Sequence, residues 1–233
     1  MSALLSIRNL SVSLPDGADR PFALQDVSID LAPSEIHCVV GESGSGKSMT
    51  ASAILQLLPE NVRVVAGRIL LAERDLLALN EEDMRKVRGA QIGMIFQEPM
   101  TALNPLRTIG DQIGEMFRTH TGLDRTEIDK RTLSLLADVR IPDPNAAARA
   151  YPHELSGGQR QRAMIAMALA LEPAVLIADE PTTALDVTTQ AQILKLIREL
   201  QIRKGTAVLF ITHDFDEAIR VADRMEGAGS GEA

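Results

Sequence analysis

The first part of the chain alternates between apolar and polar positions, as half-buried β-strands do. SIRNLSVSL (6–14) and ALQDVSIDLA (23–32) both alternate, and the segment between them, PDGADRP (15–21), is rich in turn-forming residues. SEIHCVVG (34–41) is a short apolar segment that runs into glycine, which is typical of a buried strand. This part of the chain therefore predicts two antiparallel-type strands followed by a buried, parallel-type strand.

One helix and two further strands are predicted next. From Lys47, the segment KSMTASAILQLL predicts a helix that ends before Pro59. VRVVAGRILLAERDL (62–76) predicts two strands joined by a turn at Ala66–Gly67.

The middle of the chain changes character after one more strand. QIGMIF (91–96) predicts a buried strand that ends at Gln97. From there to Leu155 no segment has a strand pattern, whereas residues 108–120, 124–139 and 145–151 have helical patterns separated by Pro and Gly. We expect an inserted helical subdomain at about residues 98–155.

The last third alternates short apolar strands with helices. AVLIADEP (174–181) and TAVLFITHD (206–214) predict buried strands, and residues 158–171 and 187–204 predict helices. This alternation predicts a parallel sheet flanked by helices, and such sheets bind ligands at the carboxyl ends of their strands. Four residues lie at or just past predicted strand ends: Gly41, Gln97, Asp179 and His213. We expect them to share one edge.

Composition narrows the possible classes of protein. The length of 233 residues predicts one domain, and the 45% of hydrophobic residues with only 3% aromatic predict an aliphatic core. The net charge of −8 argues against a nucleic-acid partner. Cys38, the single cysteine, lies among apolar residues and predicts a buried thiol. No apolar run approaches the roughly 20 residues of a membrane span and no signal peptide is apparent, so we expect a cytoplasmic protein.

The segment GESGSGKS (41–48) fits the phosphate-binding pattern G-x-x-x-x-G-K-[ST]. It follows a predicted strand and opens a predicted helix, which is the context that the pattern requires. The glycines would let backbone N–H groups face a polyphosphate, Lys47 would supply charge to the terminal phosphates, and the Ser48 hydroxyl would be a ligand for Mg²⁺. We expect the Lys47 ammonium to face solvent when no nucleotide is bound.

Two adjacent carboxylates end the strand of AVLIADEP. Asp179 is placed to partner Mg²⁺, and Glu180 to polarise a water molecule as general base. The alternative is that both only cap the turn at Pro181–Thr182; the phosphate-binding loop favours the catalytic interpretation.

Two further polar residues end predicted strands. His213 would hydrogen-bond a γ-phosphate oxygen or orient the acid, although a lone histidine is more often a core or surface residue. Gln97 would reach the metal or the attacking water, or report nucleotide state to the helical insertion; alternatively it is an ordinary polar residue at a strand end.

Five segments together resemble the ATP-binding cassette (ABC) ATPases: GESGSGKS, IFQEP (95–99), LSGGQRQR (155–162), LIADEPTTALD (176–186) and ITHD (211–214). The resemblance extends to about Met225. It implies an α/β P-loop NTPase fold in one nucleotide-binding domain, residues 1–233. That fold has a mainly parallel sheet core, an N-terminal antiparallel β subdomain and an inserted helical subdomain.

The resemblance also implies the cofactors ATP and Mg²⁺ and a set of site residues. The implied catalytic residues are Glu180, His213 and Gln97, and the implied metal ligands are Ser48, Gln97 and Asp179. The implied nucleotide-binding residues are Gly41, Glu42, Ser43, Gly44, Ser45, Gly46, Lys47, Ser48, Met49, Ser156, Gly157, Gly158 and Gln159.

LSGGQ has the small residues and helix start of a second phosphate-binding loop. In ABC ATPases the LSGGQ of one protomer covers the ATP held by the opposing protomer. The resemblance therefore implies a head-to-tail pair with a second ATPase protomer, identical or homologous, in which TTALD, ending at Asp186, lies at the protomer boundary.

A narrower resemblance concerns the ATPase subunits of peptide-type importers, carried by QIGMIFQEPMTALNP (91–105) and YPHELSGGQRQRAMIAMALALEP (151–173). It implies transmembrane permease partners and a place on the inner face of the cell membrane. The alternatives are a soluble, non-transport ABC ATPase, which the acidic charge disfavours, and a chain that binds nucleotide without turnover.

The chain departs from the family pattern at three places. Phe22, or Leu14, stands where an aromatic residue usually stacks on adenine, and Met49 stands where threonine is frequent. The final segment EGAGSGEA (226–233) predicts a flexible tail where the family has further strands, so the C-terminal end is expected to be shortened.

Overall fold

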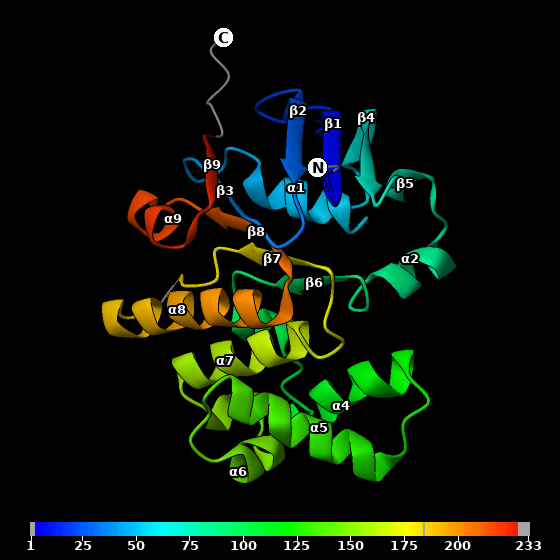
Figure 1. Cartoon of the computed structure of the whole chain (residues 1–233). Coiled ribbons are helices and arrows are strands. Elements are labelled where there is room, and N and C mark those ends of the chain that lie inside the picture. Colours follow the sequence, from blue (N-terminus) through cyan, green and yellow to red (C-terminus); the bar gives the residue numbers. More distant parts are fainter. Residues whose placement is uncertain (1–2, 184, 228–233) are drawn as a thin grey trace.

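The computed structural model describes residues 3–183 and 185–227, and it begins with a four-stranded antiparallel sheet (Figure 1). Its strands are β1 (Leu5–Ser13), β2 (Phe22–Leu31), β4 (Arg63–Leu71) and β5 (Arg74–Asp75), in the order β2-β1-β4-β5. Ile7 is fully buried and faces Ile29 on one side and Ile69 on the other. The alternation along the first strands therefore does mark an antiparallel subdomain with one buried face.

The predicted turn at Ala66–Gly67 is wrong, because both residues lie within the single strand β4. Gly67 has φ +96°, and a Cβ there would lie 2.6 Å from the backbone of Arg8 and of Asn9, at a break in the β1–β4 register. Glycine is thus needed for a close backbone approach in a bulge. The true turn falls at residues 72–73, where both residues have positive φ.

Five parallel strands form the central sheet, in the order β6-β7-β8-β3-β9. They are β3 (Ile36–Val40), β6 (Ile92–Ile95), β7 (Val175–Asp179), β8 (Ala207–Thr212) and β9 (Arg224–Gly227). The last strand corrects the expected tail, because Glu226 and Gly227 pair with Val39 and Val40. Residues 228–233 of that tail lie outside the described residues.

Helices cover both faces of the central sheet (Figure 1). On one face, α1 (Lys47–Ile54) packs with Val39 and Ile177; on the other, α7 (Gly157–Ala168) and α8 (Val187–Lys204) pack with Cys38 and Leu176. Neighbouring residues of one strand point to opposite faces, so α1 and α7 are separated by the sheet.

The helix at residue 47 ends earlier than predicted, at Ile54 rather than just before Pro59. Gln56 has φ +51°, and its side-chain amide donates to the Leu76 carbonyl at 2.5 Å, in the 3-10 turn Leu76–Ala78. Two short helices complete the core: α2 (Glu81–Val87), which the sequence patterns did not indicate, and α9 (Phe215–Val221).

Residues 98–155 are all described and contain no strand, as expected. They form α3 (Pro99–Ala102), α4 (Ile109–His120), α5 (Arg125–Asp138), α6 (Pro144–Arg149) and the 3-10 turn Pro152–Glu154. In the part of the chain that is described, no helix is both long and apolar enough to cross a membrane.

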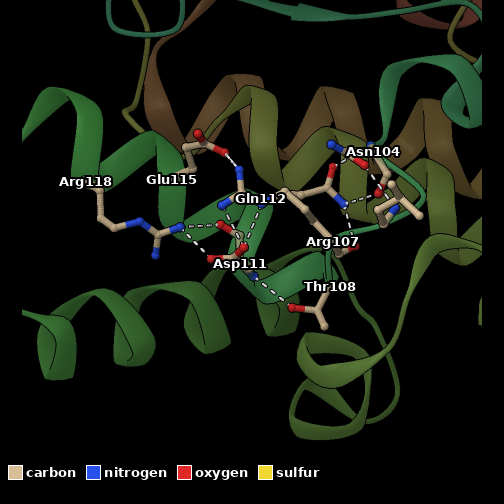
Figure 2. Close-up of polar contacts among 8 residues, drawn as sticks. Asn104, Arg107, Thr108, Asp111, Gln112, Glu115 and Arg118 are labelled. Atoms are coloured by element: carbon tan, nitrogen blue, oxygen red, sulfur yellow. Dashed lines mark hydrogen bonds and ion pairs between the residues drawn. The ribbon is translucent and has the colours of Figure 1, made fainter.

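A buried glutamine fixes the loop that leads into the helical subdomain (Figure 2). Gln112 is 7% exposed; its amide donates to the carbonyls of Asn104 and Arg107, both at 3.0 Å, and its oxygen accepts from the Asn104 N–H at 2.8 Å. Arg107 and Arg118 also flank Asp111, whose pKa is lowered chiefly by the hydrogen bond from Arg107. The segment a few residues after Gln97 is thereby tied to α4.

Candidate nucleotide-binding and catalytic site

The four strand-end residues lie at one edge of the parallel sheet, as predicted. Strand β3 ends one residue before Gly41, β6 two residues before Gln97, β7 at Asp179 itself and β8 one residue before His213. Because these strands are parallel, their carboxyl ends meet on the same side of the sheet.

The loop 41–48 has the backbone that an anion site requires. Gly44 and Gly46 have φ of +82° and +94°, and a Cβ on Gly46 would lie 2.4 Å from the Ala23 carbonyl oxygen, so only glycine fits there. Helix α1 begins after Gly46 without a side-chain cap. The N–H groups of its first turn, from Lys47 to Met49, therefore have no intrahelical acceptor and are free to donate to an anion.

The expectation that the Lys47 ammonium faces solvent is wrong. Lys47 is 5% exposed, and its Nζ donates to the carbonyls of Gly41 (2.6 Å) and Glu42 (2.7 Å) and to the Ser45 hydroxyl (3.3 Å). The loop curls around the ammonium because this charge, once buried, needs acceptors. Lys47 thus stabilises the conformation of its own loop.

Ser48 and Asp179 form a direct pair across the site. The Ser48 hydroxyl donates to Asp179 Oδ1 at 2.9 Å, although the two residues are 131 positions apart in the sequence. Asp179 is 5% exposed, and its pKa is raised mainly by burial and further by the neighbouring Glu180, while the Ser48 hydrogen bond and the Lys47 charge oppose the shift. The pair presents a hydroxyl and a carboxylate oxygen beside the phosphate-binding loop.

Glu180 is the centre of a hydrogen-bond cluster. It is 8% exposed and has φ +44°, an uncommon backbone conformation for a residue other than glycine. Its Oε2 accepts from the Gln97 amide at 3.0 Å and from the Thr183 hydroxyl at 3.1 Å, and His213 Nδ1 lies 3.2 Å away. The structure therefore brings Gln97, Glu180 and His213 together, and these contacts go beyond the capping of a turn.

Sequence analysis missed several residues that hold this cluster. Thr183 bonds Glu180 directly, and the buried Gln161 of α7 donates to the Pro181 carbonyl. Glu217 of α9 accepts from the hydroxyls of Thr182 and Thr212. Thr183 lies three positions after Glu180, and Thr212 lies five positions before Glu217, so these two contacts are local in sequence. The contacts of Gln161 with Pro181 and of Thr182 with Glu217 join segments 20 and 35 positions apart.

LSGGQ forms the start of α7. The exposed Ser156 is the N-cap: its hydroxyl accepts from the Gln159 N–H at 3.3 Å, and Gln159 Oε1 accepts from the Ser156 N–H at 3.0 Å. Gly157 and Gly158 occupy the first turn, where N–H groups lack intrahelical acceptors. Among the described residues, no hydrogen bond joins this segment to residues 41–48, which lie at the start of α1 on the other face of the sheet.

Three residues near the loop bear on base recognition. Phe22 is half-buried at the start of β2, whereas the side chains of Leu14 and Met49 pack against the hydrophobic core. Arg20, from the turn between β1 and β2, donates to the Gly44 carbonyl at 2.5 Å and so attaches this turn to the phosphate-binding loop.

These features define a P-loop nucleotide-hydrolase fold, with a phosphate-binding loop and an acid pair at the carboxyl edge of a parallel sheet. Residues 24–183 match the ABC transporter family, and the chain belongs to this family as an ATP-binding, ATP-hydrolysing cassette. It is 55% identical over 223 residues to the peptidoglycan transport ATP-binding protein YejF of Agrobacterium fabrum, covering 95% of this chain and 41% of that protein.

Other comparisons agree. The chain is 50% identical to the dipeptide transport ATP-binding protein DppD of Bacillus subtilis, covering 97% of this chain and 68% of the relative. The solved dimeric bacterial ABC transporter cassette MJ0796 superposes with a TM-score of 0.84 at 30% identity, covering 96% of this chain and 93% of that one. A structure of MJ0796 bound to ADP and phosphate after hydrolysis also has a TM-score of 0.84. The α/β fold expected from the sequence is confirmed.

Proposed function

We propose that this chain hydrolyses Mg²⁺-ATP to drive a membrane importer for peptides or similar small solutes. The observation that carries the chemistry is the buried Glu180 carboxylate, held by Gln97 and His213 next to the Ser48–Asp179 pair. The names of the relatives, which include a dipeptide transport and a glutathione import ATP-binding protein, support the transport role.

The residues present fit both ATP and Mg²⁺. The polyphosphate would accept hydrogen bonds from the free N–H groups at the start of α1, and Lys47 would exchange the carbonyls of Gly41 and Glu42 for phosphate oxygens. The Ser48 hydroxyl and the Asp179 carboxylate, 2.9 Å apart, are hard oxygen ligands of the kind that Mg²⁺ prefers, and Gln97 would add an amide oxygen. The ion would neutralise phosphate charge.

Glu180 would act as the general base. A water oxygen attacks the γ-phosphorus, its proton passes to the Glu180 carboxylate, and the bond from the γ-phosphorus to the bridging oxygen breaks to give ADP and phosphate. In the structure, Glu180 Oε2 accepts from the Gln97 amide and from the Thr183 hydroxyl, and these two bonds fix the carboxylate. The other oxygen, Oε1, would receive the proton. His213, whose Nδ1 lies 3.2 Å from Glu180, would contact the γ-phosphate through its other ring nitrogen.

The site would be completed by a second protomer. The LSGGQ helix start lies on the face of the sheet opposite to α1, so a chain does not cover its own phosphate-binding loop. In a head-to-tail pair, Ser156 and the N–H groups of Gly157 and Gly158 would instead donate to the γ-phosphate held by the partner. MJ0796, which is similar in fold, forms a dimeric structure.

Permease subunits would be reached through the helical subdomain. Gln97 contacts Glu180 at one end of the connecting segment, and Gln112 fixes Asn104 and Arg107 at the other, so a change at the site would be carried to α4. Exposed apolar side chains on this segment, Met100 and Leu106, suit contact with another protein. In this role the chain would lie at the inner face of the cell membrane.

Glu180→Gln tests the catalytic assignment. The amide keeps the shape of the side chain but cannot take a proton, so turnover should fall about 10²–10⁴-fold while ATP still binds. The variant should accumulate as an ATP-bound dimer in size-exclusion chromatography. Turnover close to that of the wild type would transfer the role of base to another group, His213 first.

Mixing two inactive variants tests the shared site. Lys47→Ala disables nucleotide binding, and Ser156→Arg places a bulky cation at the start of α7 without touching residues 41–48. In a heterodimer of the two, one composite site carries both lesions and the other carries none, so ATPase activity should return on mixing. If heterodimers form but no activity returns, the shared-site arrangement is contradicted.

A further inference from the structure

A buried carboxylate on α9 has no part in the chemistry proposed above. Glu217 is only 5% exposed, and each of its oxygens accepts one hydroxyl: Oε1 from Thr182, and Oε2 from Thr212 at 2.8 Å. Both threonines are almost completely buried, at 2% and 1% exposed. The carboxylate thus links the segment that follows β7 to the end of β8.

Among the described residues, no cation pairs with this carboxylate. In the described ranges, Glu217 forms no ion pair with a lysine, arginine or histidine. Burying an unpaired carboxylate costs free energy, and an apolar side chain of similar size would fill the same space at lower cost. The group therefore matters for what its two oxygens hold rather than for packing.

The two threonines flank the residues of the catalytic cluster. Thr182 lies two positions after Glu180, and Thr212 directly precedes His213. The Thr212 hydroxyl also accepts from the Asp214 N–H at 3.0 Å, while Asp214 Oδ1 accepts from the Glu217 N–H at 3.3 Å. The Glu180 N–H already donates to the Ile211 carbonyl at 2.8 Å, and Glu217 adds a side-chain link between the segment after β7 and the end of β8.

We propose that Glu217 is a positioning residue that sets the Glu180–His213 geometry, in which His213 Nδ1 lies 3.2 Å from Glu180 Oε2. This inference rests on the proposed ATPase mechanism. Loss of both acceptor oxygens would release the Thr182 and Thr212 hydroxyls and so loosen the residues next to Glu180 and His213. Misplacement of a reacting group by about 1 Å costs up to about 100-fold in rate. Nucleotide binding would change little, because within the described chain residues 41–48 make no hydrogen bond to Glu217, Thr182 or Thr212.

The test compares Glu217→Met, which removes both acceptors, with Glu217→Gln, which keeps one acceptor and adds a donor. Glu217→Met should lower kcat about 10- to 100-fold with the KM for ATP within about twofold of wild type, whereas Glu217→Gln should stay within about threefold in kcat. Asp216→Asn is the matched control, since Asp216 is exposed on the same turn of α9 and should leave kcat unchanged.

A second arm separates positioning from a loss of folded structure. In a Glu180→Gln background, single-turnover hydrolysis should not fall further on adding Glu217→Met, because the group being positioned is already gone. An equal loss in both backgrounds, or a wild-type kcat for Glu217→Met, would overturn the proposal. If Glu217→Met does not fold, Thr182→Val and Thr212→Val remove one donor each and should lower kcat at constant KM; wild-type kcat in both would equally overturn it. Glu180→Gln alone reports separately on the base assignment.

Discussion

Removing the Lys47 ammonium should damage both the loop and the binding of nucleotide. Lys47→Met keeps most of the methylene stem and deletes the charge that donates to the Gly41 and Glu42 carbonyls. Hydrogen bonds to a charged group contribute about 1.5–3 kcal/mol each, so two bonds at the lower value give about 3 kcal/mol. Relief of the buried charge offsets part of this, and we take the net loss to be about 2 kcal/mol, within the range for a single hydrogen bond to a charged group. In a chain of this length that loss lowers Tm by about 4–8 °C.

The effect of Lys47→Met on nucleotide affinity should be larger. A missing partner in a buried, hydrogen-bonded charge pair costs about 3 kcal/mol, or at least about 100-fold in Kd. Thermal unfolding of the free chain and calorimetric titration with a non-hydrolysable ATP analogue measure the two effects separately. Lys130→Met, on the exposed side of α5, is the control and should change neither. An unchanged Tm would refute the stabilising role of the ammonium, and an unchanged Kd would refute the phosphate-loop assignment.

Two further predictions concern buried ionisable groups. Burial raises the pKa of Asp179, so the folded chain binds this proton more tightly than the unfolded chain, and the associated stability is lost as pH rises through the folded pKa. Asp179→Asn should therefore raise the Tm of the nucleotide-free chain at about pH 8, and this gain in Tm should shrink toward about pH 4. The same substitution should abolish Mg²⁺-dependent turnover. A lower Tm at about pH 8 would contradict the prediction for stability. Burial raises the pKa of the Cys38 thiol to about 12, so the native thiol should react hardly at all with iodoacetamide at about pH 8. The urea-unfolded chain should be labelled rapidly, and mass spectrometry measures both. Rapid labelling of the native chain would mean that the sheet opens at Cys38.

Local patterns predicted the parts of the fold that local chemistry determines. The helix predicted at 187–204 is observed as Val187–Lys204, because Asp186 caps its first turn and Gly205, with φ +69°, ends it. Helix α2 was missed although Asn80 caps it through the Asp83 N–H, a signal that was available in the sequence.

The wrong predictions concern residues whose conformation depends on a segment distant in the sequence. The residues around Gly67 predict a turn, but the conformation of Gly67 is set by the close approach of β1. Strand β9 exists because it pairs with β3, almost 190 residues earlier in the chain. Its sequence alone carries no strand pattern.

The candidate site divides in the same way. The strand ends that carry Gln97, Asp179 and His213 could be placed from hydrophobic runs, since parallel strands share an edge. The burial of Lys47 depends on how its own loop curls, and the role of Glu217 depends on two threonines 35 and five positions away. Neither contact can be predicted from the spacing of residues in the sequence.

The separation of α1 and α7 by the sheet has a kinetic consequence. If each chain carries two unlike halves of a site facing in different directions, an isolated chain has no complete site at all. Well below the dissociation constant of the pair, the rate of hydrolysis should then rise with the square of the protein concentration, and the specific activity should fall on dilution. Permeases that hold two such cassettes side by side would give them a fixed local concentration, so activity would no longer depend on the total concentration of protein. Assembly itself would then activate the enzyme.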